Sequence, residues 1–505
     1  MADKFKYLFF VFTFTAIIFQ NCSQFESLDN SDNLSSEQTE DLPPANLDIS
    51  NNMFVGHLDM SDQLPPVDQL INGDMLADSY DYINADIQNI LDRENTISPS
   101  QPGLYQSSSF GNGTAQLYAL TATSDGGYAT FGNYQDGAGA TAGMAIKYSS
   151  TGAVQWAFDM GLLNTYMSFF DAIEDSDGNL LVTGIIAENG VNRGILVKFS
   201  STGNVLWTLR STGEGFESFT LAENSNVIFL AGRTSNGIYI GAVDSSLGLF
   251  TWHRNFTVPS GASGTVEAVR PYGSSQFLIS GHINGDAFLG KFNPDGSTEW
   301  VKQLDISERD AYNDVTVLVN GNILAVGGTG LADRSNDDIL LSLYSSNGEH
   351  LQSVTYGGAG AEHISSVTKL ASGELILAGR ENTMSGVDTD SFFIKANMHG
   401  NTFIRSTSVV SPLDQATFKV RQLSDQRIVA AGFGGQEMFN IILPIDLRMP
   451  ANCAATSRSR VLQNFQLASP MISDIDLQSA NLSRTGIGTL SGNMINPNFT
   501  GMACN

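Results

Sequence analysis

Short apolar stretches that end in glycine recur along most of this chain. Runs rich in β-branched and aromatic residues alternate with small clusters of Gly, Asp, Asn and Ser, a pattern typical of short strands joined by tight turns. Seven runs end in a glycine, and successive glycines lie 46 to 53 residues apart: Gly132, Gly184, Gly232, Gly281, Gly327, Gly379 and Gly432. A nearly constant period of this length indicates a repeat architecture.

The second repeat shows the structural unit most clearly. Residues 169–184 (FFDAIEDSDGNLLVTG) predict two strands joined by a turn at Asp177-Gly178, and residues 194–199 and 204–210 predict a third and a fourth strand. The other copies keep this order. Four antiparallel strands per repeat are typical of propeller blades. We therefore predict an all-β fold over residues 101–446, a seven-bladed β-propeller of four-stranded antiparallel blades.

The seventh repeat lacks a fourth strand of its own, because the chain beyond Leu447 runs into Pro450 and a polar tail. A matching segment occurs before the first repeat, where LYQSSSFG (104–111) resembles LQSVTYG (351–357) in spacing and chemistry. We predict that this N-terminal strand completes the last blade. Such closure would also remove exposed strand edges, which promote aggregation.

The tryptophans follow the repeat closely. The chain has four, and each lies four residues after the glycine of a third turn: Trp156, Trp207, Trp252 and Trp300. A large ring at one fixed place in each unit predicts packing between neighbouring blades, and we favour this role over ligand binding.

The repeat motif DGG…G…(V/I)K(F/Y)xSxGxxxW resembles the bacterial propeller repeats of secreted and surface proteins, over roughly residues 103–446. It is also similar to the Trp-docking motif of quinoprotein-type propellers, a class that includes an outer-membrane-assembly scaffold lipoprotein with eight blades. The present chain departs from that class in having seven copies. The resemblance implies a propeller fold and leaves the function open.

The N-terminus predicts a signal peptide over residues 1–21. Lys4 and Lys6 precede an uncharged stretch, 7–19, that is too short to span a bilayer, and Cys22 follows it closely. We predict that Cys22 is acylated and anchors the chain to a membrane surface, with the following serine favouring the outer membrane. The alternative is an ordinary signal peptide followed by a chance cysteine, since bulky Asn21 precedes Cys22.

Residues 22–100 predict an acidic, mostly disordered tether. Between residues 23 and 100 there are sixteen Asp and Glu but a single basic residue, Arg93. Apolar residues at helical spacing predict one helix at 75–92.

Residues 447–505 form a C-terminal extension outside the repeats, with hints of short strands near residues 472–477. It contains Cys453 and Cys504, which we predict to form a disulfide in an oxidising compartment. The alternative is two free thiols.

Catalytic and metal-binding motifs are missing from the sequence. Its six histidines form no HExxH pattern, and neither GxSxG nor a P-loop occurs. The segment 175–179 (DSDGN) resembles the start of a calcium loop, but Ile186 occupies the place of the last acidic ligand, so we interpret it as a turn. We therefore expect no catalytic residue, metal or cofactor, a quinone included. The acidic chain has no basic stripe, so we expect no nucleic-acid partner.

The variable loops between second and third strands and between blades predict a binding face, since function on a repeated scaffold comes from the differences between copies. Four polar residues directly follow repeat glycines: Asn133, Arg233, His282 and Arg380. Six aspartates could add an acidic rim: Asp286, Asp333, Asp337, Asp338, Asp388 and Asp390. The alternative is a merely polar, solvated face.

The sequence thus predicts a monomeric, lipid-anchored propeller of the bacterial envelope, at the outer membrane. We expect it to bind a protein or glycan through the loop face without catalysis. The alternative is a polysaccharide hydrolase or lyase, which would need a pair of loop-face carboxylates about 5–10 Å apart.

Overall fold

The computed structural model describes residues 103–109, most of 113–447 and six short strands between residues 456 and 504. Within 113–447, the segments outside this description are 136–140, 161–165, 189, 212–216, 236, 258–263, 331–336, 358–359, 383–388, 401–402, 411–414 and 436. The predicted signal peptide, Cys22, the acidic tether and its helix at 75–92 all lie outside the described residues. In the described part of the chain, no helix is long and apolar enough to cross a membrane.

The described strands β1 to β28 pair into seven four-stranded antiparallel units, which we call blades 1 to 7. Blade 1 consists of β2 Thr114–Ala122, β3 Tyr128–Gln135, β4 Thr141–Tyr148 and β5 Val154–Met160, and blade 2 of β6 Tyr166–Glu174, β7 Leu180–Glu188, β8 Val191–Phe199 and β9 Val205–Arg210. Blade 3 consists of β10 Glu217–Asn224, β11 Val227–Thr234, β12 Gly237–Asp244 and β13 Leu249–Thr257, and blade 4 of β14 Gly264–Tyr272, β15 Gln276–Ile283, β16 Asp286–Phe292 and β17 Thr298–Asp305.

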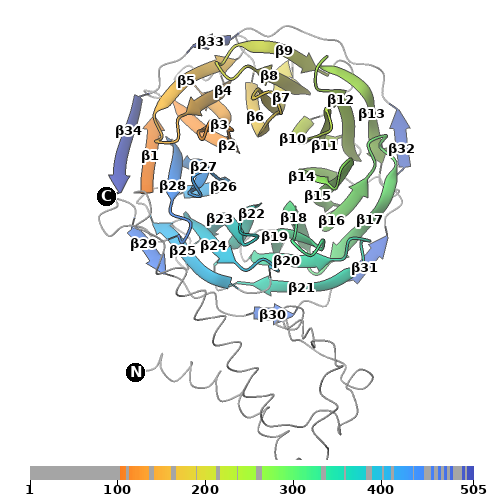
Figure 1. Ribbon diagram of the computed structural model, residues 1–505. Coiled ribbons are helices and arrows are strands. Elements are labelled where there is room, and N and C mark those ends of the chain that lie inside the picture. The colour runs from red at the N-terminus through yellow and green to blue at the C-terminus, as the bar shows by residue number, and fades with distance from the viewer. Residues whose placement is uncertain are drawn as a thin grey trace, which may run out of the picture. The chain divides into compact units, whose positions relative to one another are not determined.

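Blades 5 to 7 follow the same plan. Blade 5 consists of β18 Arg309–Val317, β19 Ile323–Gly330, β20 Asp338–Tyr344 and β21 His350–Tyr356, and blade 6 of β22 Glu362–Lys369, β23 Leu375–Asn382, β24 Thr389–Ala396 and β25 Phe403–Val410. Blade 7 consists of β26 Gln415–Gln422, β27 Ile428–Gly434, β28 Glu437–Leu443 and, as its fourth strand, β1 Gly103–Ser109. The first strand of each blade is innermost around a common centre (Figure 1). The all-β propeller fold predicted from the sequence is confirmed.

The ring closes through the N-terminal strand, as predicted. β1 pairs antiparallel with β28, and its register places Tyr105 opposite Ile441 and Ser107 opposite Phe439. The last blade therefore combines three strands from the end of the repeat region with one from its start. Backbone hydrogen bonds between distant parts of the sequence hold the ring shut.

Each innermost strand contains a bulge, and the bulge explains the repeat glycines. In all seven blades the glycine pairs with the residue just before the bulge, as Gly281 pairs with Val266 and Gly132 with Leu117. A Cβ atom added to Gly281 would lie 2.0 Å from the carbonyl oxygen of Thr265. A bulge brings the two backbones too close for any side chain, so glycine is required there.

The tryptophans pack between neighbouring blades, as predicted. Trp156, Trp207, Trp252 and Trp300 each cover the third-turn glycine of the next blade: Gly203, Gly248, Gly296 and Gly348. The indole N–H of Trp252 also donates to the carbonyl of Pro294, at 2.8 Å. In blade 7, Leu104 of β1 covers Gly152 in the same way. The hydrophobic cores lie between facing blades, as in the cluster shared by blades 1 and 2.

The lysine of the repeat motif fastens the turn between the first two strands. Lys147 contacts Asp125 at 2.9 Å, and Lys198 contacts Asp175 at 2.8 Å. Asp175 also accepts hydrogen bonds from the amides of Asp177 and Asn179. Its carboxylate therefore stabilises the turn, as the sequence interpretation of segment 175–179 expected.

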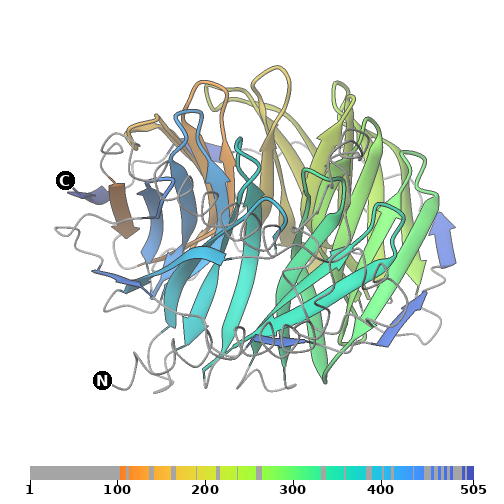
Figure 2. The same cartoon turned by 60° about the horizontal axis from the view of Figure 1, so that its bottom comes forward.

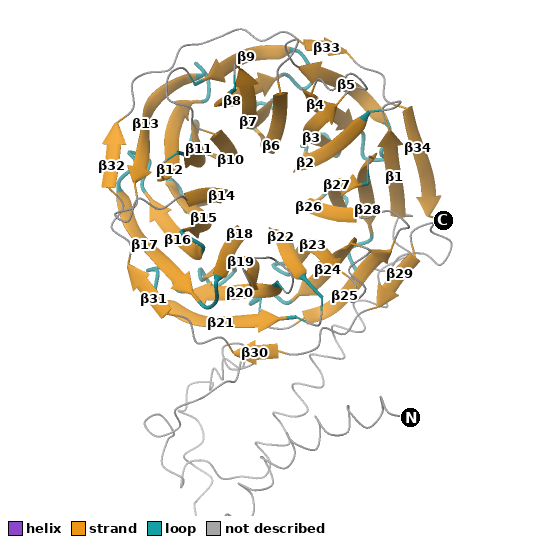
Figure 3. Ribbon diagram, turned by 180° about the vertical axis from the view of Figure 1, so that it is seen from behind, coloured by secondary structure: helices purple, strands orange, loops and turns teal. Residues whose placement is uncertain are grey.

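The described strands of the C-terminal extension lie along the outside of the ring. They are β29 Thr456–Ser459, β30 Phe465–Leu467, β31 Met471–Asp474, β32 Gln478–Asn481, β33 Gly492–Met494 and β34 Asn498–Cys504. They add an outer strand to blades 6, 5, 4, 3, 1 and 7 in turn. Figures 2 and 3 show them at the rim of the ring. Cys504 ends β34 opposite Gly103, whereas Cys453 lies outside the described residues, so the disulfide stays a prediction.

Candidate functional site

The residues that follow the repeat glycines lie on second strands, and each contacts its immediate surroundings. Asn133 is buried, and its amide donates to the Ser168 hydroxyl of the next blade at 3.1 Å. Arg233 pairs with Glu217 at 2.6 Å, and His282 lies 3.8 Å from Glu267. Arg380 pairs in register with His363. The four predicted residues therefore occupy equivalent places in four blades, engaged in separate contacts.

The predicted acidic rim is spread over blades 4 to 6. Asp337 is buried and forms an ion pair with Arg309 at 3.0 Å. Burial and the neighbouring Asp337 raise the pKa of Asp338. Asp390 is buried in β24. Asp333 and Asp388 lie outside the described residues.

Asp286 belongs to a tighter acidic cluster with Asp305 and Asp310, which the sequence analysis missed. One carboxylate oxygen of each lies within 4.8 Å of the others. Burial, followed by the charges of Asp305 and Asp310, raises the pKa of Asp286 to about 6. The three residues come from the start of β16, the end of β17 and the second residue of β18. Only the folded ring brings them together, so their sequence spacing gave no signal.

The acidic cluster has the donor chemistry of a divalent-cation site, but Asp310 is already committed. Its Oδ2 accepts from the amides of Ile306 and Ser307, at 2.7 and 3.2 Å, and its Oδ1 accepts from the hydroxyls of Ser307 and Thr329. These bonds fold the loop between β17 and β18. Asp310 therefore has a structural role, and the geometry argues for a loop anchor over a metal ligand.

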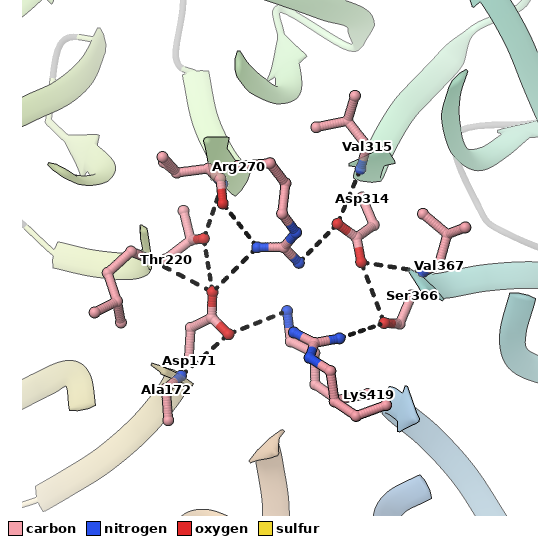
Figure 4. A network of polar contacts seen from close by, with 12 residues as sticks. Asp171, Ala172, Thr220, Arg270, Asp314, Val315, Ser366, Val367 and Lys419 are labelled. Atoms are coloured by element: carbon pink, nitrogen blue, oxygen red, sulfur yellow. Dashed lines mark hydrogen bonds and ion pairs between the residues drawn. The ribbon is translucent and has the colours of Figure 1, made fainter. Parts of the chain in front are cut away.

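A second cluster lies at the centre of the ring, and the sequence analysis missed it as well. The residue directly after each bulge we call the ring position; its members are Ala119, Asp171, Thr220, Ala268, Asp314, Ser366 and Lys419. Apart from the two alanines these are polar residues, and all are buried. In Figure 4 the side chains of Asp171, Arg270, Asp314 and Lys419 point toward one another from different blades.

Side chains at the ring position satisfy backbone amides near the bulges. The Val367 amide donates to Asp314 Oδ2 at 3.0 Å, and the Val269 amide donates to the Thr220 hydroxyl at 3.0 Å. In both cases the donor belongs to the next blade and lies one residue beyond its own ring position. A bulge interrupts the local ladder, and a buried amide without a partner is costly. The ring position therefore links successive blades through a repeated hydrogen bond.

In two places the ring position carries alanine in one blade and aspartate in the next blade. Ala119 and Ala268 have no acceptor to offer blades 2 and 5. In those blades the aspartate accepts the amide of its own successor, Ala172 to Asp171 Oδ1 at 3.1 Å and Val315 to Asp314 Oδ1 at 2.9 Å. A carboxylate has two oxygens, so each aspartate can serve its own blade and the next.

Three cations complete what we call the inner ring: Asp171, Thr220, Arg270, Asp314, Ser366, Lys419 and Arg421. Arg270 reaches Asp314 at 2.7 Å and Asp171 at 3.6 Å, and Lys419 lies 3.7 Å from Asp171. Arg421 donates to the Ser366 hydroxyl at 3.5 Å and to the Val420 carbonyl at 2.8 Å. The contacts thus run from blade 2 through blade 7 and back to blade 2 (Figure 4).

The charges of the inner ring set its protonation. Burial alone would raise the pKa of Asp171 and of Asp314, but the surrounding cations outweigh it and lower both. Burial lowers the pKa of Lys419 despite Asp171, and burial together with Arg270 lowers that of Arg421. Both carboxylates are therefore ionised at neutral pH with their oxygens occupied, which does not suit a general acid.

Aromatic side chains line one side of the centre. The extra residue of the bulge is Tyr118 in blade 1, Phe170 in blade 2 and Phe418 in blade 7. With Phe433 they form what we call the aromatic arc. Its ring centroids lie 5.2 Å apart for Tyr118–Phe418 and 5.5 Å for Tyr118–Phe170. In blades 4, 5 and 6 the same position carries Glu267, Asn313 and Ser365.

Comparison with known proteins yields distant similarities. No family model matches the chain. An uncharacterized protein of Aquifex aeolicus (strain VF5) is 33% identical over 117 residues, which are 23% of this chain and 32% of that protein, so the match spans about a third of the relative's length.

Among solved structures, the Dos1 propeller is similar with a TM-score of 0.42 and 12% identity, over 65% of this chain and 77% of that one. Sqt1 from Chaetomium thermophilum gives 0.39 and 12%, over 65% and 96%. The subtype N10 neuraminidase-like protein of A/little yellow-shouldered bat/Guatemala/060/2010 gives 0.34 and 9%, over 67% and 96%. The strand ladders of the chain itself establish its propeller fold.

Proposed function

We propose that this chain is a non-enzymatic binding or scaffold module that recognises an envelope protein or glycan through its loop face. The propeller fold suits such a role, because it holds different loops on a rigid frame. The observation that carries the proposal is the contrast between the repeated frame and the residues that follow the repeat glycines, near the ends of the second strands and next to the variable loops. Bulges, glycines and inter-blade packing repeat from blade to blade, whereas the residues after the repeat glycines differ: Asn133, Arg233, His282 and Arg380.

The lipid anchor at Cys22 is part of the same proposal. Its support is the sequence alone: a short uncharged stretch, a cysteine and a long acidic segment. An anchored, acidic tether would hold the propeller near a membrane surface while leaving its faces accessible.

Cross-linking in cells followed by affinity capture of the full chain tests both parts. We expect one partner to be recovered reproducibly, and the double variant Arg233→Ala/His282→Ala to lose it. The matched control Arg254→Gln, on the outer strand β13, should retain it. Recovery of the same partner by all variants would contradict the loop-face proposal.

The Cys22→Ala variant tests the anchor separately. We expect the wild-type chain in the membrane fraction and this variant in the soluble fraction, because the variant cannot be acylated. Membrane association that survives the substitution would contradict lipid anchoring while leaving the binding proposal intact.

The acidic cluster supports a second candidate, a polysaccharide hydrolase. A carboxyl group whose pKa is about 6 is suited to protonate a leaving group, and Asp286 has a second carboxylate, Asp305, nearby. Cleavage of envelope polysaccharide by the purified chain, lost in Asp286→Asn, would establish this candidate. Cleavage unaffected by that substitution would reject Asp286 as its acid.

A further inference from the structure

The inner ring carries more positive than negative charge. It contains two carboxylates, Asp171 and Asp314, and three cations, Arg270, Lys419 and Arg421. Asp314 and Asp171 both pair with Arg270, and Asp171 is also the ion-pair partner of Lys419. Arg421 has neutral partners, the Ser366 hydroxyl and the Val420 carbonyl, and no carboxylate within ion-pair distance among the described residues.

Asp314 and Asp171 act on the Arg421 guanidinium only at longer range, and the three cations exceed the two carboxylates by one charge, which favours a further anion. Buried charges in proteins are normally paired, because an isolated charge loses its hydration without a compensating partner. Arg421 and Lys419 belong to the same strand, β26, and Arg270 occupies in β14 the place equivalent to that of Arg421. Arg270 is 18% exposed and Arg421 is also only partly buried, so solvent reaches part of both side chains.

One member of the aromatic arc, Phe418, is the immediate chain neighbour of Lys419 in β26. Phe418 is the bulged residue that precedes Lys419, and two consecutive residues at a bulge face a single residue of the partner strand. Phe418, Tyr118, Phe170 and Phe433 are all only partly buried. An apolar wall and surplus positive charge therefore meet at the centre of blades 7, 1 and 2.

We propose that the centre of the ring binds a carboxylate joined to an aromatic or apolar body. The carboxylate pairs with Arg421 and Lys419, and the body packs on the aromatic arc. Arg421 favours this class because a guanidinium binds a carboxylate in a two-pronged, planar geometry. The site goes beyond the proposed function, since it uses inner-strand residues and not those that follow the repeat glycines.

Isothermal titration calorimetry with benzoate, acetate and phosphate, at one ionic strength, tests the proposal on the purified chain. We expect benzoate to bind saturably and at least tenfold more tightly than acetate or phosphate. A peptide that ends in phenylalanine with a free carboxylate serves as a further probe. If this peptide binds more tightly than benzoate, the natural ligand is the C-terminus of a peptide chain; if it binds more weakly, the ligand is a small molecule. Phosphate binding as tight as benzoate, or no saturable binding by any probe, would overturn the proposal.

Two variants locate the site. Arg421→Gln should weaken benzoate at least tenfold, whereas the outer-strand control Arg254→Gln should change it less than twofold. Phe170→Leu should reduce the preference for benzoate over acetate without abolishing acetate binding. Arg421→Gln should also melt at a higher temperature than wild type without ligand, which shows that it folds. Benzoate binding that survives Arg421→Gln would place the ligand elsewhere and overturn the proposal.

Discussion

Replacing Asp314 by asparagine should strongly destabilise the ring. Asp314 is fully buried, forms an ion pair with Arg270 at 2.7 Å, and accepts the amides of Val315 and Val367 at 2.9 and 3.0 Å. Removing one partner of a buried ion pair costs about 3–5 kcal/mol, because the other charge stays buried without compensation. Asparagine keeps the shape but has one acceptor oxygen, so the loss combines the missing charge with one backbone amide left without its acceptor.

Urea unfolding of the purified wild-type and variant chains measures this cost. Thr220→Val is a matched control in the same ring: it removes a neutral hydroxyl that accepts the Val269 amide and donates to Asp171 Oδ2 at 2.8 Å, and should cost about 1–3 kcal/mol. A free energy of unfolding for Asp314→Asn within about 1 kcal/mol of wild type would refute the charge argument, since even a neutral lost hydrogen bond costs that much.

The difference should also depend on pH. The pKa of Asp314 is lowered in the folded state, so its ionisation stabilises the fold above the ordinary pKa of an aspartate and this contribution disappears as the pH falls through the folded pKa. The wild type should therefore lose its advantage over Asp314→Asn in acid, below about pH 4. An advantage that stayed constant down to the folded pKa would contradict the assignment.

Three further predictions follow from the frame and the acidic cluster. Trp252→Ala should cost about 3–5 kcal/mol in urea unfolding because it removes the ring that covers Gly296 of the next blade, while Leu247→Ala, whose side chain is 62% exposed, should cost little; equal costs would contradict the packing role of the tryptophan. Gly281→Ala should cost more than about 2 kcal/mol, since its Cβ would lie 2.0 Å from the Thr265 carbonyl. Gly178→Ala would meet no atom within 4 Å and is strained by its φ of +79° alone, so it should cost less; the reverse order by thermal melting would refute the bulge explanation. The pKa of Asp286 is raised to about 6 in the folded state, so ionisation of Asp286 lowers the stability of the fold as the pH rises through about 6. Asp286→Asn should therefore stabilise the chain by about 1 kcal/mol at pH 7.5, after allowing for solvent screening, but not at pH 4, and a stabilisation that did not depend on pH would contradict the raised pKa.

The fold could be predicted because its signals are local and repeated. Gly281 is required by a bulge that recurs in every blade, and Trp252 covers a turn glycine that recurs four residues before the next tryptophan. The closing strand β1 was visible because its sequence resembles the fourth strand of another repeat. Repetition made each of these signals readable without long-range contacts.

The inner ring could not be read in the same way, although one signal was present. The residues of the ring position, five of which belong to the inner ring, lie 13 positions before each repeat glycine, or 12 in the third repeat: Ala119, Asp171, Thr220, Ala268, Asp314, Ser366 and Lys419. Aligning the copies would have shown polar residues within an apolar strand. The direction of their side chains depends on the bulge, because one extra residue in the strand moves every later side chain to the other face of the sheet. The bulged position itself carries different residue types in different blades, so it could not be recognised from one residue type.

The acidic cluster and the outer strands depended on contacts between distant segments. Asp286, Asp305 and Asp310 meet because two loops and three strand ends converge. The strands of the C-terminal extension contain three to seven residues, too few for a clear alternating pattern, and pairing with a blade edge defines them.

Hydrogen exchange followed by mass spectrometry tests the closed ring most directly. The account rests on a rigid propeller whose last blade is completed by β1, from Gly103 to Ser109. It predicts that amides of this segment exchange as slowly as those of β5, which pairs with β4 and β33 and so lies at the same place in blade 1. Exchange of residues 103–109 at the rate of an unstructured peptide, with β5 protected, would contradict closure.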